Sequence, residues 1–186
     1  MWAIICGNSG YNFTMHTLLF LSMRVLHVVL AGAWLGAAML ATLYLGPAIQ
    51  ELGPAGAPVL ATMVRRGVVA YMASIGGLTV VTGIYLFWRF TGGFDPAVSA
   101  SRAGMAFSIG ALTGVIALAI GGSVVGRGVK KIAALGAQAA ALPEGPERAA
   151  IMSSTNALRE RAAMALKIVV FQLFISMATM ALGHYI

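Results

Sequence analysis

Residues 23–49 read MRVLHVVLAGAWLGAAMLATLYLGPAI and form an apolar run long enough to cross a lipid bilayer. As an α-helix, about 20 such residues rise roughly 30 Å, which matches the hydrocarbon thickness of a membrane. Arg24 and His27 lie just inside the start of the run, and Gly46 followed by Pro47 interrupts its end. This stretch predicts an integral membrane protein.

The composition of the whole chain supports the same prediction. Of 186 residues, 60% are hydrophobic and only 9% are charged, whereas soluble domains average about half and about a quarter. The net charge of +7 does not indicate nucleic-acid binding, because the basic residues cluster between apolar runs, where membrane topology places them. The single cysteine excludes an internal disulfide and a cysteine-based metal cage. We therefore expect the lipid bilayer, and no nucleic acid, as a partner.

Three further apolar runs follow the first, and they predict an all-α membrane protein of four spans. A single membrane domain over residues 1–186 is expected, with spans at about 23–45, 67–88, 103–125 and 162–185.

The segments around the spans carry their own signals. Residues 16–22 are interpreted as an outward extension of the first span, with a short interfacial helix as the alternative. The GPAGAP run at 53–58 predicts a loop, with the next helix beginning near Leu60. Residues 127–161 are helical in pattern but polar, and PEGP at 143–146 predicts a turn. This part therefore predicts a helical hairpin that projects from the membrane.

Orientation follows from the basic residues. Cytoplasmic loops carry an excess of Lys and Arg, so the first and third loops are expected on the cytoplasmic side, with both termini on the outer side of a bacterial inner membrane. The predicted fold is then an antiparallel four-transmembrane-helix bundle with a cytoplasmic helical hairpin between helices 3 and 4. The first and third loops hold Arg65, Arg66, Arg127, Lys130, Lys131, Arg148, Arg159 and Arg161, against Arg24, Arg89 and Arg102 on the other side.

Two histidines are the strongest candidates for chemistry, because ionisable residues within spans are costly and often functional. His27 lies about one turn inside the outer end of the first span, and His184 lies close to the outer end of the fourth. Two neutral imidazoles facing each other at one depth are what a bis-histidine haem b needs, and Arg24, on the same face as His27, would pair with a propionate. In the alternative, His27 bonds a neighbouring helix, His184 is interfacial and Arg24 reaches the head groups.

Two further interpretations concern metals. His16 lies eleven residues before His27 on the same helix face, so it is an alternative iron ligand opposite His184, or simply an interfacial residue. The chain has 11 methionines, and thioether and imidazole groups are soft ligands for cuprous copper. Copper uptake is accordingly a third hypothesis, although methionine is also an ordinary filler of apolar cores.

Signals for enzymatic catalysis are missing from the sequence. There is no phosphate loop, nucleophile–base pair or carboxylate dyad, and all five acidic residues lie outside the spans. We expect no catalytic residues. The second hypothesis is therefore a non-catalytic accessory subunit of a larger membrane complex, or a homo-oligomer, held through glycine-rich faces such as the GxxxG pair Gly110 and Gly114.

The first two spans resemble a known group of proteins. RVLHVVLAGAWLGAAML at residues 24–40 is similar to the start of four-helix bacterial membrane proteins of the copper-resistance D-type group, in which a basic residue, a histidine and Trp-x-Gly follow at this spacing. The HemJ-type protoporphyrinogen oxidases and several uncharacterised integral membrane families share a related opening, and GGLTVVTGIYLFW at 76–88 resembles the latter.

The resemblance implies a haem-binding or copper-associated bundle, with His27 as the residue carried over. The HemJ-type proteins are expected to carry a lysine within a later span. Here the third span has none, and Lys167 lies at an expected membrane edge. The oxidase activity is therefore not carried over.

Overall fold

The computed structural model describes the backbone of residues 3–186 and the side chains of residues 15–186 except Pro54. Within that part of the chain, all regular structure is helical. Four helical stretches are long and apolar enough to cross a membrane, as expected for a multi-pass membrane protein: Met15–Glu51, Val68–Phe90, Arg102–Ala141 and Pro146–Leu182.

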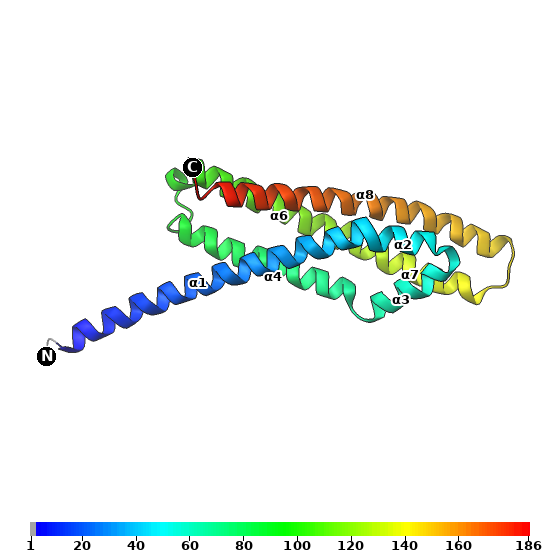
Figure 1. The fold of residues 1–186 in the computed structure, drawn as a ribbon, viewed down its shortest axis with the longest axis horizontal. Helices are drawn as coiled ribbons and strands as arrows, with labels where there is room; N and C mark the ends of the chain where they lie inside the picture. Colours follow the sequence, from blue (N-terminus) through cyan, green and yellow to red (C-terminus); the bar gives the residue numbers. More distant parts are fainter. Residues whose placement is uncertain (1–2) are drawn as a thin grey trace.

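Long helices lie side by side along one axis, and the N-terminal part of α1 extends past the other helices (Figure 1). Each helix is joined to the next directly or by a short turn. In chain order they are α1 (Ala3–Leu40), the π-helical segment η1 (Ala41–Leu45), α2 (Gly46–Glu51), the 3₁₀ turn η2 (Gly53–Ala55), α3 (Gly56–Arg65), α4 (Val68–Phe90), α5 (Pro96–Ser99), α6 (Arg102–Ile120), the π-helical segment η3 (Gly121–Gly126), α7 (Arg127–Ala141) and α8 (Pro146–Leu182).

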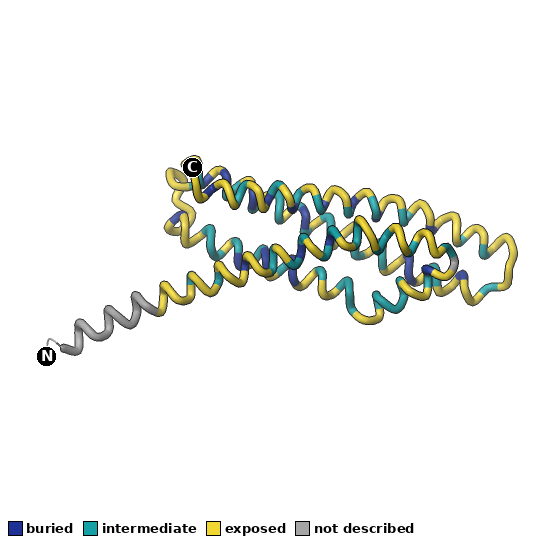
Figure 2. The backbone as a smooth tube through the Cα atoms, viewed as in Figure 1, coloured by how far each residue is buried: buried dark blue, intermediate teal, exposed yellow. Residues whose placement is uncertain are grey.

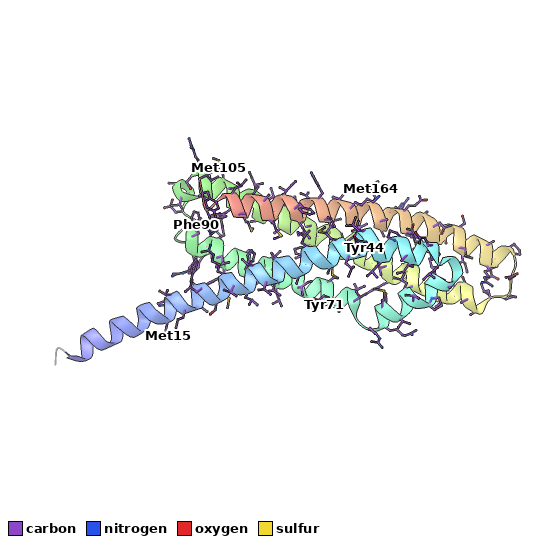
Figure 3. All side chains as sticks on the ribbon, in the orientation of Figure 1. Met15, Tyr44, Tyr71, Phe90, Met105 and Met164 are labelled. Carbon is purple, nitrogen blue, oxygen red and sulfur yellow. The ribbon has the colours of Figure 1, made fainter. Side chains whose placement is uncertain are left out.

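The exposed surface carries many large apolar side chains, unlike the surface of a water-soluble protein, while the buried residues are mostly apolar with a few polar ones such as His27 and Thr79. Val25, Leu112 and Phe171 are 64%, 62% and 66% exposed. Figure 2 shows that buried positions are few, and Figure 3 places exposed side chains such as Met105 and Met164 on the outside. So large an apolar surface is what contact with lipid tails requires.

The core takes side chains from all four long helices. α1 packs mainly against α4, and α6 packs mainly against α8. The buried residues that meet in the centre are Trp34 and Ala38 from α1, Ile75 from α4, Ala117 from α6, and Val169 and Leu173 from α8.

Glycines allow close approach in the α6–α8 pair. A Cβ built at Gly110 would lie 2.8 Å from Cγ of Met180, and one at Gly114 would lie 3.5 Å from Oγ of Ser176. Ser176 also donates a hydrogen bond of 2.8 Å to the carbonyl oxygen of Gly110. Gly110 and Gly114, interpreted above as part of a face for a neighbouring subunit, thus lie in the contact between α6 and α8 within the chain. By contrast, a Cβ built at Gly122 would have no neighbour within 4 Å.

Of the loop predicted at residues 53–58, the second half belongs to the α-helix α3 and the first half forms the 3₁₀ turn η2. The helix continues through η1 into α2, with the N–H of Gly46 donating to the carbonyl oxygen of Ala41, and Pro47, which has no N–H, lies directly after this π-helical turn. The turn shrinks to residues 52–55, with Gly53 at a left-handed φ of 54°. The predicted loop is thus wrong in extent, and α3 begins at Gly56 and packs against α7.

The structure shows the secondary structure of two segments that were predicted to extend the spanning helices, residues 16–22 and residues 127–161. Residues 16–22 continue α1 without a break, so they extend the first spanning helix and do not form a separate interfacial helix. Residues 127–161 form α7 and the first part of α8, with the expected turn between Ala141 and Pro146. These helices do not stand alone, since α7 packs against both α3 and α8.

Candidate functional site

His27 is buried between α1 and α4 and is only 9% exposed. Its Nδ1 lies 2.9 Å from the carbonyl oxygen of Thr79 and 3.1 Å from Oγ1 of Thr82. A carbonyl oxygen only accepts, so the hydrogen-bond network assigns the proton to Nδ1, which donates to Thr79. Nε2 then carries the lone pair, and it makes no hydrogen bond with the described residues.

The ring of His27 is accommodated by a glycine of the neighbouring helix. A Cβ built at Gly83 would lie 2.9 Å from Cε1 of His27 and 3.7 Å from its Nε2. Trp34 meets Gly76 in the same way, with Cε2 and Cζ2 3.0 Å from a Cβ built there. From the first pair to the second, the contact moves seven residues forward along α1, from His27 to Trp34, and seven residues backward along α4, from Gly83 to Gly76. The two helices therefore run in opposite directions.

His184 lies just after α8 and is held by protein groups at both ring nitrogens. Its Nδ1 lies 3.1 Å from the carbonyl oxygen of Met180, to which it donates. Nε2 therefore accepts a hydrogen bond of 2.6 Å from Nη2 of Arg24 on α1. Arg24 and His184, both predicted to face a haem, thus bind each other.

Aromatic rings extend this contact toward two more helices. Phe107 of α6 meets the His184 ring edge to face, with centroids 5.4 Å apart. Phe90, the last residue of α4, meets Phe107 in the same manner at 5.0 Å. Residues from α1, α4, α6 and the C-terminal turn therefore converge at this end of the molecule, where Figure 3 labels Phe90. Sequence reasoning missed this cluster, because nothing in the sequence pairs Phe90 with Phe107.

His16 lies elsewhere on α1. It is exposed and lines an open cavity of about 340 Å³ together with Thr17, Phe20 and Arg89. The structure therefore associates His16 with the end of α4, and its alternative role opposite His184 stays a prediction.

Clustered metal ligands are not found in the described part of the chain. No group of three or more His, Cys, Asp or Glu residues there could hold a metal ion. Copper binding by methionine and histidine stays a prediction.

The chain was compared with known protein families, with curated proteins and with solved structures. None of the three comparisons found a match. The resemblance of the first two spans to the copper-resistance D-type and HemJ-type groups therefore stays a prediction.

The two histidines differ in how well they fit a haem. His27 has the donor chemistry of a haem ligand, because a ligating imidazole commonly donates its other N–H to a backbone carbonyl or a carboxylate, as Nδ1 does to Thr79. His184 does not fit in this arrangement, since Arg24 occupies its Nε2. Of the two histidines, only His27 has an Nε2 without a hydrogen bond to the described residues.

Proposed function

We propose that this chain is a multi-pass protein of the bacterial inner membrane, an antiparallel four-helix bundle with both termini on the outer side. The apolar exposed surface supports the membrane location. The opposite chain directions of α1 and α4 support the bundle. The basic residues near α3, α7 and the start of α8 support a cytoplasmic position for those helices, including the hairpin of α7 and α8.

We further propose that the protein binds haem b through Nε2 of His27 and serves electron transfer or a redox complex. The observation that carries this proposal is the buried imidazole whose Nδ1–H donates to Thr79, which leaves the Nε2 lone pair without a hydrogen bond to the described residues. Haem b, when bound, would supply one-electron chemistry to such a protein.

Neighbouring residues have distinct roles in this proposal. The carbonyl oxygen of Thr79 fixes the tautomer of His27, and the hydroxyl of Thr82 lies beside the same Nδ1. Gly83 leaves room for the ring, because any side chain there would meet Cε1. His184 becomes a second iron ligand only if its hydrogen bond to Arg24 breaks. Arg24 is then released for a carboxylate partner.

An absorption spectrum of the detergent-purified protein tests the proposal. We expect a Soret band, for which ligation by His27 suffices, and a sharp α-band on reduction with dithionite only in the fraction of molecules in which His184 has left Arg24 and binds the iron as well. His27→Asn is the informative variant, because the asparagine amide can still donate to Thr79 while it lacks a ligand at the Nε2 position. A folded His27→Asn protein should lose the bands, and His16→Asn should keep them. A featureless spectrum from folded wild-type protein supplied with haem would overturn the proposal.

A non-catalytic accessory subunit is the second candidate. The observation that favours it is that both histidines already have protein partners, His27 with α4 and His184 with Arg24, so each also serves to hold helices together. This candidate predicts no cofactor and a constant stoichiometry with larger membrane subunits through purification.

A further inference from the structure

The open cavity between α1 and the end of α4 is lined by two basic side chains, an aromatic one and a threonine. His16, Thr17 and Phe20 come from consecutive turns of α1, and Arg89 comes from the last turn of α4. The cavity holds about 340 Å³, room for a group larger than a single ion.

Its depth along the helices follows from the α1–α4 pairing. In two antiparallel helices, residues at the same level have numbers that add to a constant. His27 lies level with Gly83 and Trp34 with Gly76, so for α1 and α4 this constant is 110. The same sum places Phe20 level with Phe90, the last residue of α4. The cavity therefore lies where the apolar stretch of α4 ends, at the level expected for lipid head groups.

Arg89 has no acidic partner. It makes no ion pair or hydrogen bond with the described residues. The nearest acidic residue along the chain is Asp95, and its Oδ1 accepts from the backbone N–H groups of Ala97 and Val98 at the start of α5. The guanidinium is thus available for an external anion.

We propose that this cavity binds the phosphate of an anionic phospholipid from the adjoining leaflet. Arg89 provides a planar cation suited to phosphate, and a ring N–H of His16 provides a second donor. Phe20 provides an apolar surface for the glycerol and first acyl carbons, which a free phosphate ion would not use. The bound lipid would link the projecting part of α1 to α4.

Lipid retention measured by native mass spectrometry tests this proposal. The purified protein is loaded with phosphatidylglycerol or with phosphatidylcholine and then exchanged into lipid-free detergent. We expect wild-type protein to keep phosphatidylglycerol in preference to phosphatidylcholine. Arg89→Gln and His16→Gln should each weaken that retention, by about fivefold for the arginine.

Arg102→Gln is the matched control, because Arg102 is exposed, begins α6 at the same end of the molecule and does not line the cavity. It should retain phosphatidylglycerol as wild type does. Unchanged retention in Arg89→Gln would overturn the proposal, and so would an equal loss in Arg102→Gln. Displacement of the lipid by millimolar inorganic phosphate would overturn the assignment to a lipid. Haem content is read separately from the spectrum, so this test is independent of the haem proposal.

Discussion

The imidazole of His27 lies against the backbone of Gly83, so closely that a Cβ built there would be 2.9 Å from Cε1. Trp34 lies against Gly76 two turns further along, with its ring carbons 3.0 Å from the corresponding Cβ position. The buried rings of His27 and Trp34 on α1 therefore pack against glycines of α4, where no side chain keeps them away from the backbone. In lipid, where no hydrophobic effect drives helices together, such close fit is a main source of association.

Gly83→Ala should destabilise the protein by about 1–3 kcal/mol, because the new methyl group forces the His27 ring away from Thr79. Thermal or denaturant unfolding in detergent measures the effect. Gly77→Ala is the control on the same helix, since a Cβ there meets nothing within 4 Å and alanine favours a helix over glycine. Equal stability of the two variants would contradict the packing described here.

Gly110→Ala should weaken the α6–α8 pair by a similar amount. Its methyl group would lie 2.8 Å from Cγ of Met180 and 2.9 Å from Oγ1 of Thr179. Gly122→Ala, within the same apolar stretch, meets nothing within 4 Å and should leave the unfolding temperature near that of wild type. If Gly122→Ala proved the more damaging of the two, the α6–α8 interface would be wrongly placed.

Ser176→Ala should lower the free energy of unfolding by about 1 kcal/mol, the usual size of a hydrogen bond between membrane helices. Ser176 donates across the interface to Gly110, whereas Ser108 donates within its own helix to Gly104. Ser108→Ala is therefore the control and should have the smaller effect. Parallel unfolding curves of the two variants measure the difference.

Sequence patterns were sufficient for the parts of the fold that depend on local composition. The four long helices follow from apolar length, and the packing of Gly110 follows from its GxxxG spacing. The α2–α3 turn was predicted too long, since Pro58 was interpreted as a loop residue although it fits the first turn of α3.

The sequence could not predict which residues of two helices contact each other, because these contacts depend on the relative position of the helices along their axes. The contact of His27 with Gly83 and the hydrogen bond to Thr79 arise only once α1 and α4 are aligned. The same holds for the two π-helical segments. The α1–α4 pairing places Val68 level with Thr42 of η1, and Gly126 of η3 lies against Val69. Of the two segments, η3 thus packs against the start of α4, whereas η1 packs against α8.

The hydrogen bond between Arg24 and His184 leads to a last prediction, which distinguishes two roles for the arginine. Arg24 now occupies Nε2 of His184, the atom that a second iron ligand would need. If Arg24 competes with iron for that atom, Arg24→Ala should increase the low-spin α-band of the reduced protein, and His184→Ala should abolish the band.

If Arg24 instead pairs with a propionate, Arg24→Ala should lower the haem content. Hydrogen exchange at residues 183–186 provides the control, because the loss of the 2.6 Å bond to α1 should speed exchange there in both variants, whether or not haem is bound. Unchanged exchange would mean that the bond does not hold the C-terminal turn. Since the contact is exposed, the free energy of global unfolding should change by less than about 1 kcal/mol in either variant.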